Sequence, residues 1–507
     1  MKSIDVLPDD ILLGIFDVYM KECCIRSAKR RVEAWQSLVH VCRRWRSLIF
    51  QSPGHLNLQL FCTPDTPTKD TLGIWPALPL IVRGEVALSS GTDNVIAALA
   101  QSNRVREVNL TVLGNWQLDE VLTAMEVPLP ELTDLRLKSE SMEYDETIIP
   151  DSFLGRSAPR LRVFTLDYVP FPGFPNLLLS ANHLVELRLV NIPHSGHISP
   201  PAIVALISVL SSLRMLCLQF QSPRSLHDLE SPSLPPPKRS ILPALNEFRF
   251  QGATEYLEEV VTSIDTPRLD KMHITFFDHI NFDCPRLAQF ISCTPALLGA
   301  PGKARVKFKG WTSSVALLAR PRTLEIVITY GEPDRQLWSV GRICNYSLPP
   351  PLTVDDLYIG RRLGYSYSQP VWRNDGTLWL QLLLPFTAVK RLYLSREFAP
   401  GIAVALQELG GNRPDGITVL LPNLQNIFVE GLEPSGPFQE YIVQFVAARQ
   451  LSGHAIVISV WDDVSDRDLV SDGDSVSDGG SVSDEDSVSD GDLVSDGDSV
   501  SEGGPMH

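Results

Sequence analysis

Two short stretches carry side chains whose types and spacing could do chemistry. His194 and His197 are separated by two residues in "HSGH", and two imidazoles at that spacing could bind one metal ion. They lie in a Pro- and Gly-rich segment with no Cys or carboxylate beside them, so we expect a surface loop. Cys23 and Cys24 lie among Lys and Arg residues, which favour a thiolate. The eight cysteines form no paired CxxC spacing, so we expect reduced, mostly buried thiols.

No motif of an enzyme accompanies these residues. The chain has no G-x-x-x-x-G-K-[ST], G-x-S-x-G, H-E-x-x-H or G-x-G-x-x-G pattern. These patterns would indicate phosphate binding, acyl transfer, zinc hydrolysis or dinucleotide binding. We therefore expect a protein that is not an enzyme and has no catalytic residues, no cofactor and no metal ion.

The charge of the chain is concentrated at one end. The 507 residues are 44% hydrophobic and 21% charged, as in soluble globular proteins. The formal net charge is −16, of which −14 falls on residues 462–507, leaving −2 for the rest. A nearly neutral body indicates no basic face for nucleic acid. There is no apolar run of about 18 residues and no signal-peptide pattern, so we expect no membrane span and a cytoplasmic or nuclear location.

The first apolar stretch, "VLPDDILLGIF", is too apolar for an exposed N-terminus. Pro8 suits the first turn of a helix, and Asp9 and Asp10 favour its positive end, so we expect a helix over residues 8–20. Its apolar residues cover about half of the helix circumference, whereas a helix that packs on a single core needs an apolar face only about 100° wide. We therefore expect this helix to contact two neighbours, its own core on one side and a partner protein on the other. In the chain alone, part of residues 7–16 should then be exposed.

A second periodic stretch, "EAWQSLVHVCRRWRSLIF", predicts one helix or two that join at residues 40–42. Residues 21–34 between the two stretches are basic and weakly periodic, which indicates a loop or a frayed helical insert. The two halves, in this order, resemble the F-box, the helical motif by which substrate receptors dock onto the Skp-type adaptor of SCF ubiquitin ligases. The spacer is longer than in a compact F-box, and a helical cap on the next domain is the alternative.

The resemblance implies an F-box over residues 1–55, whose apolar residues either face the adaptor or pack in the adjacent core of the chain. Which residues face the adaptor and which pack in the core stays open. The implied adaptor-binding set is Leu7, Pro8, Ile11, Leu12, Ile15, Phe16, Val41, Cys42 and Trp45.

The long middle repeats the pattern apolar-x-x-apolar-x-apolar, which predicts strands. Helix-like stretches such as "DNVIAALAQS" and "PPAIVALISVLSS" lie between the occurrences. The ten occurrences start at Val105, Leu132, Leu161, Leu184, Leu213, Leu245, Leu269, Val354, Val389 and Leu424.

These strand-and-helix units resemble leucine-rich repeats, although the Asn or Cys after each strand is mostly missing. The fold class we expect is α/β: a short all-helical F-box, then an irregular leucine-rich-repeat-like α/β solenoid over residues 56–460. Insertions are expected at 222–240 and 330–351, and two stacked α/β domains are the alternative. Residues 456–460 are expected to form the last strand, although they also resemble motifs that add a strand to ubiquitin-like modifiers.

Residues 461–507 repeat a hexapeptide such as "SVSDGD". With almost no apolar side chains the segment cannot offset the entropy of ordering, so we expect a disordered acidic tail. Several serines have acidic residues at positions +1 and +3, the context that acidophilic kinases favour. These candidate phosphorylation sites are Ser471, Ser483, Ser489 and Ser495.

Together the resemblances imply a non-enzymatic substrate-recognition subunit of an SCF-type ubiquitin ligase. Its partners would be a Skp-type adaptor, a cullin bound through that adaptor, and an unknown protein substrate on the repeat region. The outward strand positions there include Glu186, Arg188 and Tyr393. The alternative is a repeat-based interaction scaffold that works outside ubiquitin ligation.

Overall fold

The structure is a computed structural model of the chain. It describes residues 7–26, 28–140, 147–171, 176–222, 239–277, 284–294, 296–297, 302–319, 321–329, 332–348, 353–361, 376–408, 420–431, 437–451 and 453–461. Residues 1–461 form one compact unit. The acidic tail and its four candidate serines lie outside the described residues, as does most of the expected insertion at 222–240.

Three helices begin the chain: α1 (Asp9–Arg26), α2 (Ala28–Val39) and α3 (Arg43–Gln51). The break between α2 and α3 confirms the predicted junction at residues 40–42. The predicted end of the first helix at residue 20 is wrong, and of the two alternatives for residues 21–34 the helical one is confirmed, because α1 ends at Arg26 and α2 begins at Ala28. This stretch, "KECCIRSAKRRVEA", contains no Gly or Pro and is rich in Lys, Glu, Arg and Ala, which favour helix.

Most of the remaining chain has a mixed α/β structure. Its described strands form one sixteen-stranded, mostly parallel sheet, and helices connect many of them. In each of the ten repeat patterns the second and third apolar residues lie on a strand, and in nine of them the first lies two residues before that strand. Residues 457–461 form the last strand, which pairs in parallel with its predecessor. The strands of the regular run are β1 (Leu60–Cys62), β2 (Leu80–Val86), β3 (Val105–Val112), β4 (Asp134–Ser139), β5 (Val163–Asp167), β6 (Glu186–Ile192), β7 (Met215–Phe220), β9 (Glu247–Gly252), β11 (Lys271–Phe276), β15 (Asp356–Arg361), β16 (Arg391–Leu394), β17 (Asn426–Glu430) and β18 (Val457–Trp461).

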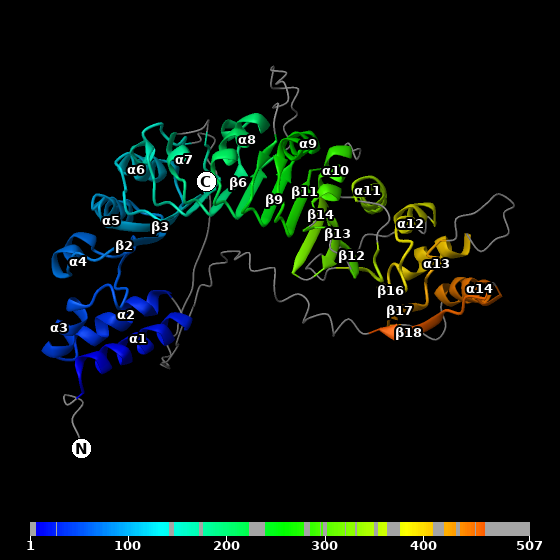
Figure 1. Cartoon of the computed structure of the whole chain (residues 1–507), viewed down its shortest axis with the longest axis horizontal. Helices are drawn as coiled ribbons and strands as arrows, with labels where there is room; N and C mark the ends of the chain where they lie inside the picture. Colours follow the sequence, from blue (N-terminus) through cyan, green and yellow to red (C-terminus); the bar gives the residue numbers. More distant parts are fainter. Residues whose placement is uncertain are drawn as a thin grey trace, which may run out of the picture. The chain divides into compact units, whose positions relative to one another are not determined.

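Helices connect successive strands, and those from α5 to α11 lie along one side of the sheet (Figure 1). Neighbouring helices of this layer pack on one another. We call the opposite side of the sheet the open face, because none of the described helices α5 to α11 lies over it (Figure 1). The connecting helices are α4 (Thr68–Ile74), α5 (Ser89–Leu99), α6 (Asn115–Ala124), α7 (Asn176–Ser180), α8 (Pro200–Val209), α9 (Thr254–Ser263), α10 (Pro285–Cys293), α11 (Pro333–Tyr346), α12 (Gly376–Leu383), α13 (Ala399–Glu408) and α14 (Pro437–Leu451).

The sequence order of the strands reverses once, in the middle of the sheet. Strands β12 (Lys303–Lys309), β13 (Thr312–Ala319) and β14 (Arg322–Thr329) form an antiparallel meander. β14 pairs with β11 and β12 pairs with β15, both in parallel. At the first tight turn Gly310 has a φ of 45°, a conformation that glycine adopts without steric cost.

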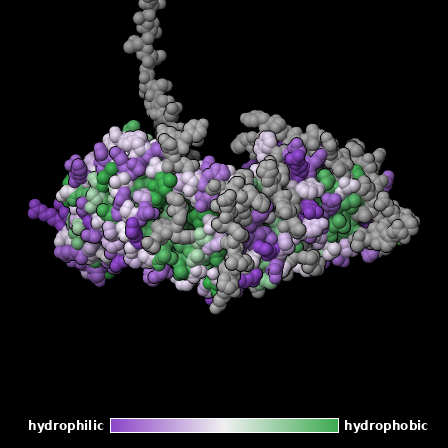
Figure 2. All heavy atoms as spheres, turned by 90° about the horizontal axis from the view of Figure 1, so that it is seen from above, coloured by the Kyte–Doolittle hydropathy of each residue, from purple (hydrophilic) through white to green (hydrophobic). Residues whose placement is uncertain are grey.

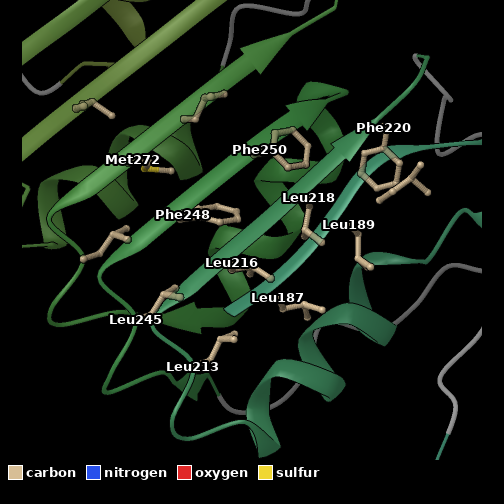
Figure 3. Close-up of a cluster of buried hydrophobic side chains, with 14 of the residues drawn as sticks. Leu187, Leu189, Leu213, Leu216, Leu218, Phe220, Leu245, Phe248, Phe250 and Met272 are labelled. Carbon is tan, nitrogen blue, oxygen red and sulfur yellow. The ribbon is translucent and has the colours of Figure 1, made fainter. Parts of the chain in front are cut away.

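The apolar positions of the repeated pattern form continuous buried rows beneath the helices. Register pairs Leu187 with Leu216, and Leu216 with Phe248, so each residue stacks on its counterpart in the next strand. Figure 3 shows these side chains together with Phe250 and Met272, all pointing to the same side of the strands. Each unit therefore completes the core of its neighbour.

Three parts of the sheet region differ from the sequence prediction. Residues 330–351 were expected to be an insertion, and a helix was not predicted there; the described part, 332–348, contains α11 (Pro333–Tyr346), which leads from β14 to β15. The meander was not predicted, because its strands do not follow the repeated pattern; buried and outward residues alternate along β12 and β14. β1, β2 and a small two-stranded sheet of β8 (Ser240–Ile241) and β10 (Ile264–Asp265) were also not predicted.

Candidate interaction surfaces

Helix α1 has two apolar faces side by side. Leu12, Phe16 and Met20 are almost completely buried. On the adjoining face Ile11 is 49% exposed and Ile15 is 45% exposed. The expectation that part of residues 7–16 lies exposed is therefore confirmed. Val18 and Tyr19 continue this exposed face at helical spacing, and both are also more than 40% exposed.

The turn between α2 and α3 lies near the start of α1. Cys42 caps α3, and its Sγ accepts a hydrogen bond from the Trp45 amide at 3.4 Å. From the first turn of α3, Arg44 donates to the Asp9 carboxylate and to the Leu7 carbonyl, each at 2.6 Å from Nη2. These bonds hold the start of α3 against the start of α1. The exposed Val41 precedes this cap directly.

The helices are fixed to one another and to the sheet by aromatic side chains. The ring of Trp45 packs on that of Phe16 with centroids 4.7 Å apart. Trp35 is 2% exposed, and its Nε1–H donates to the Gln59 carbonyl at 3.1 Å, just before β1. Its ring also packs against Trp75 at 5.1 Å. The exposed face of α1 therefore belongs to a module with a well-packed base.

The structure divides the nine residues of the implied adaptor-binding set. Leu12 and Phe16 belong to the core of the chain itself, because their side chains face α2 and α3; they cannot touch a partner in this conformation. Val18 and Tyr19 were not in the set, although their spacing from Ile11 and Ile15 was the signal that could have included them. The exposed members are Pro8, Ile11, Ile15 and Val41, and the half-buried ones are Leu7, Cys42 and Trp45.

A second candidate surface is the open face of the sheet. The outward strand positions alternate with the buried rows, and charged residues on them pair along the same strand. Arg188 donates to Glu186 on β6 at 2.5 Å, and Arg249 donates to Glu247 on β9 at 2.7 Å. Glu186, Arg188 and Tyr393 all lie half-buried on this face, as the pattern predicted. Figure 2, seen from above, shows the opposite side, which carries helices α5 to α11, and there hydrophilic and hydrophobic residues are interspersed.

Asp167, on the open face at the end of β5, gives this surface a pH dependence. Burial raises the pKa of its carboxyl above the ordinary value, although Asn191 donates to it at 2.7 Å and Lys138 lies nearby. The pKa of Asp167 is higher in the folded state than in the unfolded state. Its ionisation therefore lowers the free energy of unfolding as the pH rises from the unfolded-state pKa through the folded-state pKa.

We therefore expect Asp167→Asn to raise the melting temperature at pH 7, since the amide keeps an oxygen for Asn191 and carries no charge. The difference from the unmodified chain should shrink toward pH 3, where the carboxyl is protonated. Thermal denaturation followed by circular dichroism between pH 3 and pH 7 measures this. Asp119→Asn, at an exposed position of α6, is the matched control, and an equal gain there would contradict the explanation.

The residues first considered for chemistry lie in separate places. His194 is exposed, and its Nε2 lies 2.7 Å from the Ser222 hydroxyl. The His197 ring packs instead against Phe220 and Tyr256, so the two imidazoles have different surroundings. No group of three or more His, Cys, Asp or Glu side chains in the described part of the chain could hold a metal ion. The side chains of Cys23 and Cys24 lie outside it.

The described cysteines are mostly buried, as expected. Cys62, Cys217, Cys284 and Cys344 are buried, Cys42 is half-buried and Cys293 is exposed. Burial raises the pKa of Cys217 to about 12, which opposes thiolate formation although Arg188 and Arg249 lie nearby. Burial also raises the pKa of Cys62 and of Cys344.

Within the described residues, no helix combines the length and the apolar character needed to cross a membrane. Searches with this sequence found no matching protein-family model and no matching curated protein.

Proposed function

We propose that the chain is a non-enzymatic substrate receptor of an SCF-type ubiquitin ligase. In this proposal residues 1–55 act as an F-box that docks a Skp-type adaptor. Residues 56–460 act as a leucine-rich-repeat-like solenoid that holds a target protein. Support comes from the F-box-like residues, from the helices they form, and from the strand-and-helix units that follow. The cytosol or nucleus is the proposed location.

The observation that carries this proposal is the exposed apolar face of α1. Here we define the α1 face as Ile11, Ile15, Val18 and Tyr19. The same helix already buries Leu12, Phe16 and Met20 in its own core, so these four side chains are not needed for the fold. Burying a fully exposed side chain of this kind contributes about 1.5–3 kcal/mol, and because these four are about half exposed, covering each contributes roughly half of that. A partner that covers the face would therefore gain substantial binding energy.

The test is co-purification of the full chain with a recombinant Skp-type adaptor. We expect Ile11→Asp combined with Ile15→Asp to abolish the adaptor complex, because each change places a carboxylate where the partner needs an apolar side chain. The fold should persist because both positions are exposed, and circular dichroism checks this. Leu179→Asp combined with Val209→Asp, at exposed positions of α7 and α8, is the matched control and should retain the adaptor. Adaptor binding by the folded α1 variant would refute the docking assignment.

A pull-down with a cullin separates the proposal from the scaffold alternative. A substrate receptor should recover the cullin through the adaptor, and the α1 variant should lose both proteins together. Recovery of the adaptor without the cullin would favour a scaffold that works outside ubiquitin ligation.

A further inference from the structure

The sheet ends differently at its two outer strands. At the β1 end, α2 packs against the sheet, and Trp35 donates to the Gln59 carbonyl just before β1. At the other end (Figure 1), β18 pairs with β17, and no further strand of the described residues pairs with it. We call the edge of β18 that faces away from β17 the free edge.

The backbone groups at the free edge belong to Ile458 and Val460. Val457 donates its N–H to the Gln425 carbonyl, so its backbone groups point toward β17. Successive residues of a strand turn their N–H and C=O groups to opposite edges. Ser459 therefore also points toward β17, whereas Ile458 and Val460 point away from it. A strand of another molecule can pair with these two residues without breaking any hydrogen bond to β17.

The side chains at the free edge are apolar and uncovered. Val429 on β17 is 2% exposed, whereas its register partner Val460 is 60% exposed. Val457, on the opposite side of β18, is 57% exposed. In the preceding units the next strand covers the position of Val460. A further strand at the free edge would bury this side chain and continue the core of the repeated units.

The sequence of β18 lacks the features by which proteins usually protect an outer strand. Such strands often carry Lys or Pro or contain a bulge. β18 has the sequence "VISVW" and pairs with β17 without a shift of register. Residues 456–460 also resemble motifs that add a strand to a partner protein. The free edge is therefore suited to pairing with another chain.

The charge of the chain indicates which partner suits the free edge. Residues 462–507 carry a formal charge of −14 and begin directly after β18. Pairing between the free edges of two copies would bring two such segments together, and like charges repel each other. A partner strand with Lys and Arg beside it would instead be attracted.

We propose that the free edge of β18 binds an exposed strand of a partner protein that carries basic residues beside that strand. The partner strand extends the sheet, and its apolar side chains cover Val460. This interaction is separate from the proposed docking of an adaptor, because β18 and β1 lie at opposite ends of the strand order and the α1 face is not involved. Failure of strand binding and failure of adaptor docking are therefore distinct results.

Fluorescence anisotropy tests the proposal with the full chain and a fluorescein-labelled peptide, Lys-Lys-Val-Thr-Val-Thr-Val-Lys-Lys. We expect saturable binding that weakens at least tenfold in 1 M salt, where the Debye length falls to about 3 Å. The same peptide with methylated backbone nitrogens cannot donate to a strand and should not bind. Replacing its Lys residues by Glu should weaken binding at least tenfold. Absence of binding by the Lys peptide, or equal binding by either altered peptide, would overturn the proposal.

Substitutions at Val460 locate the site. Val460→Pro removes a backbone N–H from the free edge and keeps the bonds to β17, since Pro is tolerated where the N–H of an outer strand faces solvent. It should weaken binding at least tenfold. Val460→Gln, which removes the apolar side chain, should weaken it at least threefold. Val460→Leu keeps both features and is the matched control. Thermal denaturation checks that each variant is folded, and a folded Pro or Gln variant that binds like the unmodified chain would refute the assignment.

The contribution of the acidic segment is tested with a chain that ends at Trp461, since residues 1–461 form a compact unit. The shorter chain should bind the Lys peptide at least threefold more weakly, because the attracting charge is lost. Tighter binding would show that residues 462–507 themselves occupy the free edge. Equal binding would show that they do not attract the partner. Either result would overturn the assignment of a basic partner.

A second copy of the chain is the other occupant to test. Light scattering at the concentrations of the titration should find the full chain monomeric, because the two acidic segments repel each other. A dimer that Val460→Pro abolishes would show that the free edge pairs with itself, and would overturn the proposal.

Discussion

Trp35→Ala is expected to release the three N-terminal helices from the sheet. The indole is buried, donates to the Gln59 carbonyl, and packs against Trp75 and against Phe50 at 6.3 Å. Truncating a buried Trp typically costs about 3–5 kcal/mol. The loss falls at the contact between α2 and the segment before β1, so it should destabilise the helices more than the strands.

Hydrogen exchange followed by mass spectrometry measures this difference by region. Protection of α1–α3 should fall at least a hundredfold, because each 1.4 kcal/mol corresponds to about a factor of ten. Protection of β5–β7 should change little. Trp116→Ala, at a half-exposed position of α6, is the control and should leave α1–α3 unchanged. Uniform loss of protection over the chain would show that the helices and the sheet open as one cooperative unit.

Phe308→Ala is expected to destabilise the sheet by about 3–5 kcal/mol, the usual cost of removing a buried aromatic ring. Phe308 is 1% exposed on β12, facing away from the open face. Its ring packs against Phe398 at 5.0 Å and Trp379 at 6.1 Å, so truncation leaves a cavity between the meander, α12 and α13.

Urea denaturation followed by circular dichroism tests this expectation. Trp311→Ala is a control in the same meander, because Trp311 is 73% exposed at the turn after β12. An exposed position of this kind should change the free energy of unfolding by no more than about 0.5 kcal/mol. Equal effects of the two substitutions would contradict the assignment of Phe308 to the core.

The sequence predicted the regular strands well because one physical requirement recurs in each of them. A parallel strand covered by a helix on one side needs apolar residues at fixed intervals, and Leu187, Leu216 and Phe248 meet that need in adjacent strands. The meander escaped prediction because buried and outward residues alternate along β12 and β14, and its strands have no connecting helices. The repeated pattern therefore contained no signal for them.

The candidate surfaces were only partly accessible from sequence. The pattern placed Ile11 and Leu12 in one apolar half-cylinder and could not divide it, because the division depends on where α2 and α3 pack.

The reversed strand order at the meander has a consequence for how the chain folds during synthesis. From β3 to β7 each strand can pair with its predecessor as soon as it is made, and β9 can pair with β7. β11 can pair with β9 in the same way, but its other edge must wait for β14, since Lys271 pairs with Thr323, 52 residues later. Contacts between distant residues form slowly because a long loop must close first. We therefore expect β11 to expose an unpaired edge on the nascent chain, which makes this strand the point at which chaperones are most needed.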